Sequence, residues 1–556
     1  MPNLSEFLTH SFVIRAAALA AVLIFAFWPL LGDRLFHPIE RVGTALARKK
    51  WLAIFAVAII PILIRVVLLI VVAPPLPSIH DEFSYLLASD TLAHGKLTNP
   101  SHPMWQFFDT FHVIQQPTYM SKYPPAQGFF LAFGQLLGHP WIGVLLSMGL
   151  AYGSALWMMQ GWLPPQWAFI GVVLLMARFD LLSYWANSYW GGFVALIGGA
   201  LVMGALPRLM RRCKVRYAVV MAVGVGILAN SRPYEGFLLC VPVVIALIIW
   251  LFSAKSPPWR VTASKFIAPA GVLCVLIFIF MGYYNFRLTG HVSLFPYMAY
   301  ANTHDPIPIF VWEKFGTIHY ENPQFAKFYG EVEPAVIAGR MWNGHWQKIV
   351  QDVFDTASHM FFSGRITVVV LLAGFLWIIR DRRTRLLLIQ ATICFAGFCL
   401  STWLISHYTA PVVATIFCLV VQVMRHLRRM WIGDRPVGIG LTRLMVLGVI
   451  GASCFSLAMR IHNATNKYNT VGLWRETVVE QLDQQAGEQL ALVRYTPEHN
   501  VHDEWVYNRA DIDHSKIVWA REIPGLDLAP LLKYFPDRQV WVVEPDVTPP
   551  KVTRYR

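Results

Sequence analysis

The chain has 556 residues, of which 56% are hydrophobic and only 14% are charged. Soluble domains carry roughly 25% charged residues, and many apolar runs here are about 16–22 residues long, the length a helix needs to cross ~30 Å of hydrocarbon, so a soluble fold is excluded. The formal net charge is +14, but the basic residues form short clusters between apolar runs, which indicates orientation in a membrane and not binding to nucleic acid.

Taken in chain order, the apolar runs predict an all-α polytopic membrane protein with about twelve transmembrane helices. The stretch 124–138 is also apolar, but it is short and begins with two prolines, so we expect it to form a helix lying at the membrane interface. The predicted spans lie at roughly 11–32, 51–73, 141–160, 164–182, 191–210, 217–232, 236–252, 266–285, 366–380, 386–404, 411–424 and 443–460.

The connections between these spans divide into two groups by charge. Short basic loops stay in the cytoplasm, and alternation then places the other connections, including long loops at 74–140 and 286–365, on the outer face. We therefore expect a transmembrane domain at 1–460 and a domain outside the membrane at 461–556. The strongly basic connections are 34–50, 208–216, 255–265, 380–385 and 425–443.

The polar tail after residue 460 has the patterns of a small α/β domain. Segments 490–495, 516–520 and 539–543 resemble strands, and 528–534 has helical spacing. The seven cysteines all fall in apolar runs or in a basic loop. No disulfide framework and no cysteine-based metal site is therefore expected on the outer face.

The first outer loop opens with two adjacent carboxylates, Asp81 and Glu82, directly after a predicted span. A carboxylate at the boundary between water and lipid can act as a general base toward an acceptor hydroxyl. Both acids can equally stabilise the first turn of a helix at 83–93 through its dipole. Position alone does not separate these roles, which are compatible.

Lys122 and Tyr123 follow in the same loop, before Pro124 and Pro125. They are candidates to contact a lipid phosphate at headgroup level, although lysine and aromatic residues also serve as plain interface anchors.

Three short outer turns carry further candidates for substrate binding. Trp and Tyr next to Asn and Ser suit a sugar ring, which has apolar faces and hydroxyl edges, but they also form ordinary aromatic belts. Arg232 can hold a phosphate in a bidentate manner, or it can pair with Glu235. The candidates are Asn187, Tyr189 and Trp190; Arg232, Tyr234 and Glu235; and His407 and Tyr408.

One arginine inside a predicted span and several histidines can be explained by a structural role without a functional one. Arg65 lies inside a predicted span, where a partner within the helix bundle, such as a carboxylate, is favoured over a substrate role. The residues His80, His102, His112 and His407 could form a metal site with Asp81, but no ligand spacing supports one, so we predict no metal site.

Several of these motifs, taken in order, resemble the GT-C glycosyltransferases, and most of all the bacterial branch related to aminoarabinose transferases and protein O-mannosyltransferases. The resemblance covers most of residues 50–425 and extends weakly into the tail. It rests on His-Asp-Glu-Phe-Ser-Tyr at 80–85, Lys-Tyr-Pro-Pro at 122–125, the aromatic turn at 183–192, Asn-Ser-Arg-Pro-Tyr-Glu-Gly at 230–236 and His-Tyr-Thr-Ala-Pro at 407–411.

The resemblance implies a bacterial inner-membrane enzyme that transfers a hexose or pentose from a polyprenyl-phosphate donor to a lipid, glycan or protein acceptor on the periplasmic face. Asp81 would then be the base and Glu82 its support, with Arg232 and Lys122 on the departing phosphate. No cofactor is firmly predicted, because only some relatives bind a divalent cation. The chain departs from the family in an extra first span and in a turn at 183–190 that lacks an acid, for which Asp180 is the nearest substitute.

Two other classes of function compete with this interpretation. A flippase or transporter for a lipid-linked saccharide predicts carboxylates or broken helices at the bilayer midplane and paired inverted halves, and the sequence shows no such repeat. A scaffold or sensor leaves the Asp81–Glu82 pair unexplained. Membrane lipids are partners in every case.

Overall fold

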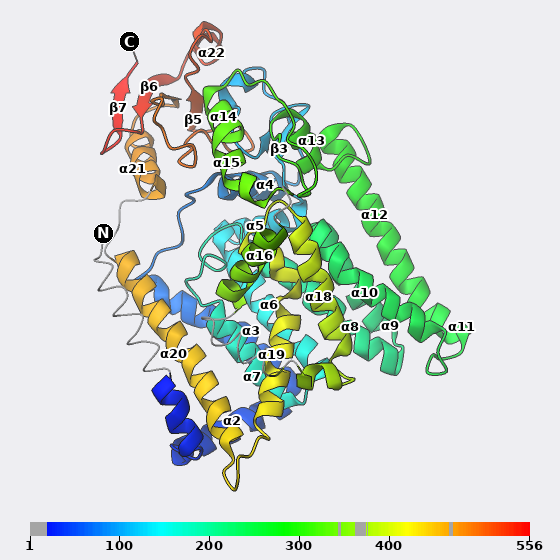
Figure 1. Ribbon diagram of the computed structural model, residues 1–556. Helices are drawn as coiled ribbons and strands as arrows, with labels where there is room; N and C mark the ends of the chain where they lie inside the picture. Colours follow the sequence, from blue (N-terminus) through cyan, green and yellow to red (C-terminus); the bar gives the residue numbers. More distant parts are fainter. Residues whose placement is uncertain (1–18, 343–345, 362–373, 375, 466–470, 556) are drawn as a thin grey trace.

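The computed structural model describes residues 19–342, 346–361, 374, 376–465 and 471–555, and within these it is mainly helical with two small β-sheets (Figure 1). Among the described helices, seven are long and apolar enough to cross a membrane: Lys50–Ile70, Pro140–Trp162, Phe193–Arg212, Pro233–Leu251, Trp259–Thr289, Ser406–Leu427 and Val437–Ala464. This agrees with the prediction of an integral membrane protein.

Three shorter apolar helices, α7 (Pro165–Arg178), α9 (Val215–Ala229) and α18 (Arg385–Leu400), occupy three further predicted spans. The predicted spans at 11–32 and 366–380 lie partly outside the described residues. The count of twelve is therefore not confirmed, although each of the other ten predicted spans coincides with an apolar helix.

The centre of the bundle is formed by α6 (Pro140–Trp162) and α8 (Phe193–Arg212), which are buried on nearly all sides. Small residues let these helices approach closely: a Cβ at Gly204 would lie 2.4 Å from the Trp157 ring. By contrast α12 (Ala268–Thr289) and α20 (Val437–Thr465) lie at the periphery with apolar side chains facing outward.

The first of the two loops predicted to be outer loops, residues 74–140, contains α4 (His80–Ala93), a three-stranded sheet and α5 (Pro125–Leu136). The strands are β1 (Asn99–Pro100), β2 (Val113–Ile114) and β3 (Thr118–Ser121), in the order β1-β3-β2. The stretch predicted to form an interfacial helix is α5, which at 12 residues is too short to cross a membrane.

The second outer loop contributes α13 (Pro296–Thr303), α14 (Pro323–Lys327), α15 (Glu333–Ile337) and α16 (Trp346–Phe361). The 3₁₀ turn η6 (Ser406–Val412) precedes α19 (Val413–Leu427), and α10 (Pro233–Leu251) begins directly after Arg232. These elements converge around the start of α4.

The tail forms α21 (Val471–Asp483), β4 (Gln489–Val493), β5 (Ile517–Arg521), α22 (Ala529–Tyr534), β6 (Gln539–Glu544) and β7 (Lys551–Arg554). Its sheet has the order β5-β4-β6-β7, in which the first three strands are parallel and β7 is antiparallel to β6. The three predicted strands and the predicted helix are confirmed, whereas α21 and β7 were not predicted.

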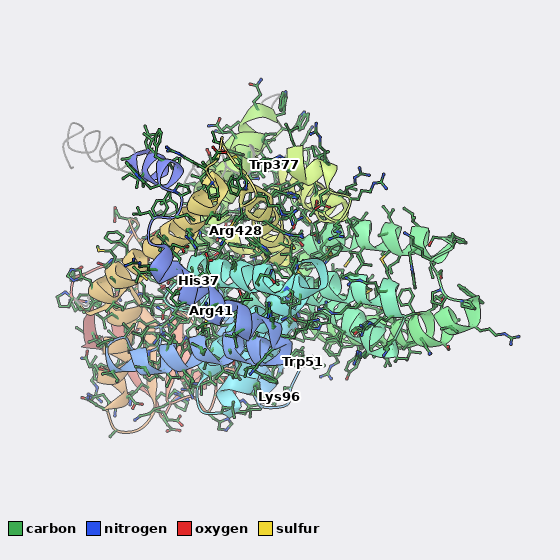
Figure 2. The ribbon with its side chains drawn as sticks, turned by 90° about the horizontal axis from the view of Figure 1, so that it is seen from below. His37, Arg41, Trp51, Lys96, Trp377 and Arg428 are labelled. Atoms are coloured by element: carbon green, nitrogen blue, oxygen red, sulfur yellow. The ribbon has the colours of Figure 1, made fainter. Side chains whose placement is uncertain are left out.

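The two ends of the helix bundle carry different elements. Figure 1 shows α4, α13 to α15 and the tail sheet at one end, and α2 (Asp33–Arg48) with the turn between α19 and α20 at the other. Figure 2 looks at the second end, where it labels His37, Arg41 and Arg428. Arg428 and Arg443 both bind Glu40 of α2 at 3.0 Å, which joins two of the predicted basic connections.

Candidate functional site

A cavity of about 440 Å³ lies where the outer loops, the start of α10, the turn η6 and the tail meet. Its polar wall carries acids, cations, histidines and aromatic rings. The lining side chains that bear on chemistry are His80, Asp81, Tyr85, His112, Lys122, Tyr123, Trp190, Arg232, Tyr234, Glu235, Asp305, Glu333, Tyr408 and His502.

Asp81, at the start of α4, is the carboxylate held most tightly in this cavity. Its Oδ1 accepts a hydrogen bond from the Tyr123 hydroxyl, and its Oδ2 lies 3.1 Å from His80 Nδ1 and 3.9 Å from His112 Nε2. Burial opposes ionisation, but the two imidazoles and the Tyr123 hydroxyl outweigh it and lower the pKa of Asp81 below its usual range. Asp81 is therefore an ionised carboxylate at neutral pH.

His112 reaches the cavity from an unusual backbone conformation. Its φ is +62°, in the left-handed region that residues other than glycine rarely adopt. The strained turn is fixed because its carbonyl accepts from Ser84 Oγ at 2.6 Å and its amide donates to the Tyr300 hydroxyl at 3.0 Å. Burial and the nearby Lys122 ammonium hold the pKa of His112 well below its ordinary value. Strain of this kind concentrates at functional sites.

Glu82 does not line the cavity. Its Oε2 accepts from the amides of Ser78 at 2.9 Å and Ile79 at 3.4 Å, and its Oε1 accepts from the amide of Tyr189 at 3.1 Å. Burial raises the pKa of Glu82, although these hydrogen bonds act to lower it. Glu82 thus ties the first turn of α4 to the aromatic turn, and its neighbour Asp81 faces the cavity.

Two cations, Arg232 and Lys122, line the same cavity as Asp81. The guanidinium of Arg232 lies 4.1 Å from the centre of the Tyr408 ring, and Lys122 Nζ lies 4.7 Å from the centre of the Tyr300 ring. Among the residues described, Arg232 forms no ion pair with a carboxylate within 4.0 Å, and Glu235 acts on it only at longer range. The side chain remains available to an anionic ligand.

Asp305 and Glu333 are two further carboxyl groups of the cavity that sequence analysis missed. Burial, followed by the neighbouring Asp305, raises the pKa of Glu333 to about 9, and burial also raises the pKa of Asp305. Glu333 is therefore protonated at neutral pH. Neither residue belongs to a local motif, because Asp305 follows α13 and Glu333 starts α15. Only the folded second outer loop brings them to Lys122.

The other predicted site residues fall into two groups: some line the cavity, and the others do not reach it. Trp190, Tyr234, Glu235 and Tyr408 line the cavity together with Lys122, Tyr123 and Arg232. Asn187 instead accepts a hydrogen bond from Arg65, Tyr189 donates its hydroxyl to the Pro75 carbonyl at 2.8 Å, and His407 is buried behind Trp190. These three side chains do not reach the cavity.

Arg65 finds its partners without a carboxylate. Its guanidinium donates to the carbonyls of Val72 and Ala73 and to Asn187 Oδ1, each at 3.1 Å, and it stacks on Trp141 at 4.4 Å. The expected partner within the bundle is confirmed, although it is not the carboxylate given as an example, because the backbone after α3 (Lys50–Val67) unwinds and supplies acceptors. Asp180, the nearest substitute for the missing acid, accepts a hydrogen bond from the Leu182 amide at 2.9 Å through its Oδ1. It does not line the cavity.

The ligand atoms of His80, Asp81 and His112 lie within 4.8 Å of one another, so this group could hold a metal ion. His80 Nε2 also lacks a hydrogen-bond partner among the described atoms, and two imidazoles with one carboxylate are ligands that zinc accepts. His102 is not part of the group, because its Nε2 lies 3.0 Å from Asp513 of the tail. Sequence spacing missed the cluster because 31 residues separate its two halves.

No protein-family model and no curated protein matches the sequence. In fold the chain is similar to the oligosaccharyltransferase of Archaeoglobus fulgidus in complex with Zn and sulfate, at 12% identity and a TM-score of 0.47, with 88% of this chain and 67% of that chain covered. It is also similar to ArnT from Cupriavidus metallidurans in the apo state, at 13% identity and a TM-score of 0.47, with 90% and 93% covered.

A third similar structure is the archaeal oligosaccharyltransferase AglB from Archaeoglobus fulgidus in complex with an inhibitory peptide and a dolichol-phosphate, at 12% identity and a TM-score of 0.44, with 89% and 69% covered. A likeness this distant assigns no role to any residue, so the functional conclusion depends on the cavity itself.

Proposed function

We propose that the chain is an inverting glycosyltransferase, which moves a sugar from a polyprenyl-phosphate donor to an acceptor hydroxyl on the outer face of the membrane. One observation carries this proposal: Asp81, whose carboxyl pKa is lowered by its neighbours, lines the same cavity as Arg232, a half-buried guanidinium that has no carboxylate within 4.0 Å among the described residues. The first suits proton removal from a hydroxyl, and the second suits a phosphate.

The reaction follows from these two groups. The acceptor oxygen forms a bond to the anomeric carbon as Asp81 takes its proton, and the bond from that carbon to the phosphate oxygen breaks with its electron pair staying on the lipid phosphate. Attack from the side opposite the phosphate inverts the configuration. Arg232 and Lys122 stabilise the negative charge that develops on the leaving phosphate.

The surrounding residues orient the reacting groups. Tyr123 and His80 hold the Asp81 carboxylate, and Glu82 fixes the turn of α4 that carries it. Trp190 and Tyr408 offer ring faces to a sugar. If a divalent cation binds, His80, Asp81 and His112 would hold it, and it would supply polarisation of the acceptor hydroxyl.

Most of the remaining lining is apolar, as a prenyl chain requires. Ile309, Val332, Val336, Trp403 and Ile405 form this part of the wall. The cavity therefore presents polar groups for a phosphate sugar beside an apolar surface for its lipid.

Replacing Asp81 by Asn tests the proposal. The purified variant should bind a labelled polyprenyl phosphate within about threefold of wild type and lose transfer by roughly 10²–10⁴-fold, the usual contribution of a general base. Lipid and glycan profiles of a deletion strain carrying the variant should match the deletion. Glu331→Gln, an exposed carboxylate of the second outer loop, is the matched control.

Undiminished transfer by Asp81→Asn would refute the proposal. Loss of transfer together with continued movement of a lipid-linked saccharide across the membrane would favour the transporter alternative.

A further inference from the structure

A second cavity, of about 560 Å³, lies at the end of the bundle opposite the Asp81 cavity, between α2, α7, α19 and α20. We call it the α2 cavity. Figure 2 looks at this end of the molecule and labels Arg428, which lines the cavity. The basic connections at 34–50 and 425–443 predict that this end faces the cytoplasm. The function proposed above gives this space no role.

The helices α7 and α20 run past this cavity in the same direction. Gln166 and Arg443, near their starts, both line it, whereas Arg460, near the far end of α20, lies 3.7 Å from Asp180, just after α7. Beyond these starts the lining becomes apolar on both helices. It then consists of Phe169, Ile170 and Val173 on α7 and of Val446, Leu447 and Ile450 on α20.

The α2 cavity therefore has a polar end and an apolar end, in the order of the headgroup and acyl chains of a membrane lipid. The apolar end is open to the surroundings of the bundle, because Ile39, Leu447 and Ile450 of its lining are exposed. An acyl chain can therefore enter between α2 and α20 from the side.

Positive charge is in excess at the polar end. The charged residues of the lining are four arginines and one acid, Glu40. Glu40 binds Arg428 and Arg443, each at 3.0 Å, and Arg443 also binds Asp33 at 2.8 Å. The single acid of the lining is thus already shared by two of the four arginines.

Arg425 and Arg429 are the other two. Among the residues that the structure describes, neither has a carboxylate within 4.0 Å or a hydrogen bond from its side chain. Arg425 is half-buried and Arg429 is exposed, so a ligand can reach both. Guanidinium groups bind phosphate in a bidentate manner, and basic pockets between transmembrane helices bind anionic headgroups. We propose that the α2 cavity binds an anionic phospholipid, with its phosphate at Arg425 and Arg429.

The charge and shape of the α2 cavity also select among ligands that carry a phosphate. A zwitterionic headgroup would bring its ammonium close to the arginines, which repel it. An inorganic phosphate would leave the apolar end unfilled and would gain nothing from burial of apolar surface. A phospholipid with a net negative headgroup satisfies both ends, and it would join the peripheral α2 and α20 to α7 and α19.

Native mass spectrometry of the full chain in detergent tests this. The protein is titrated with palmitoyl-oleoyl phosphatidylglycerol, or with phosphatidylcholine that has the same chains. Wild type should bind the anionic lipid at least tenfold more tightly, and inorganic phosphate at the concentration of the lipid should not displace it. The double variant Arg425→Gln/Arg429→Gln should bind phosphatidylglycerol at least tenfold more weakly and phosphatidylcholine as wild type does. Arg212→Gln/Arg260→Gln makes the same change at exposed positions of two other basic connections and should bind like wild type.

A second variant leaves every charge in place. Gly43 of α2 lines the cavity, and within 4 Å a Cβ there would meet only the Phe169 ring, at 4.0 Å. Gly43→Leu should therefore fill the apolar end without opposing the fold, because leucine also favours a helix more than glycine does. It should weaken phosphatidylglycerol binding at least tenfold. Gly451→Leu on α20 points into open space outside the lining and should bind like wild type.

Four results would overturn the inference. They are equal binding of the two lipids by wild type, displacement of the lipid by inorganic phosphate at equal concentration, unchanged phosphatidylglycerol binding in either folded cavity variant, and an equal loss in the Arg212→Gln/Arg260→Gln control. The last result would show a general attraction to positive charge in place of a site. Sugar transfer enters none of these measurements, so the inference stands or falls separately from the proposed function.

Discussion

At the scale of single residues, the site is defined by how burial acts on carboxyl groups that lie close together. Asp81 lies beside one phenol and two imidazoles, which lower its pKa, and it stays ionised. Burial and the neighbouring Asp305 raise the pKa of Glu333 to about 9, and it stays protonated. One cavity thus holds an acid in each protonation state. Separation of this kind is what acid–base chemistry requires.

The titration of Glu333 predicts a pH dependence of stability. The folded pKa near 9 lies above the ordinary value of 4.5, so the stabilisation is fully present below pH 4.5 and is lost as pH rises through about 9. Melting temperatures of wild type and Glu333→Gln, measured from pH 5 to 10, should show the wild type falling relative to the variant as pH rises. A constant difference between the two would contradict the assignment.

Arg232 predicts a separate effect on donor affinity. A hydrogen bond to a charged group contributes about 1.5–3 kcal/mol, so Arg232→Gln should weaken binding of a polyprenyl phosphate by roughly 10–100-fold. Titration of labelled lipid into the purified protein measures this. The exposed outer residue Arg287, changed to Gln, is the matched control and should bind normally. Equal affinities in all three proteins would remove Arg232 from the phosphate site.

At the scale of elements, the sequence predicts features that depend on one segment alone. It does not predict features that depend on contacts between distant segments. Ten predicted spans coincide with apolar helices, since length and hydrophobicity belong to each segment alone. The short strand β7 was missed because its side chains are mostly exposed and give no alternation. The approach of His112 to Asp81 was missed because it follows from a left-handed turn fixed by Tyr300, a residue 188 positions later in the chain.

The position of α5 depends on glycines at its crossing with α6. A Cβ at Gly143 would lie 2.0 Å from the Phe130 carbonyl oxygen, so Gly143→Ala must move the two helices apart. Overpacking of this kind costs about 1–3 kcal/mol, and it should lower both the melting temperature and transfer, because Tyr123 immediately precedes α5. Gly451→Ala on α20 meets open space and should be neutral or slightly stabilising. A Gly143→Ala protein as stable as Gly451→Ala would contradict the close approach.

At the scale of the whole molecule, the tail is part of the site and not an independent appendage. His502 lines the Asp81 cavity, with its ring 5.7 Å from that of His80. Tyr507 stacks on Phe83 of α4 at 4.3 Å, and the buried pair of Arg521 with Glu504 lies against the first outer loop. Docking of the tail therefore bears directly on the helix that carries Asp81.

Breaking the stack between Tyr507 and Phe83 should loosen this docking. Removal of a large buried ring costs roughly 3–5 kcal/mol, so Tyr507→Ala should lower the melting temperature and reduce transfer while binding of a polyprenyl phosphate changes little. Tyr507→Phe keeps the stack and should resemble wild type. Full transfer by folded Tyr507→Ala would show that the tail is dispensable for the reaction.

The two adjacent acids of α4 show how one dipeptide can divide two tasks. A helix turns by about 100° per residue, so neighbours cannot face the same place: the shorter acid faces the cavity, and the longer one spans the gap to three amide groups. Their order therefore carries information that charge and composition do not. A chain in which the pair is transposed would look identical to any count of acidic residues, yet it would have neither a base in reach nor a secured helix.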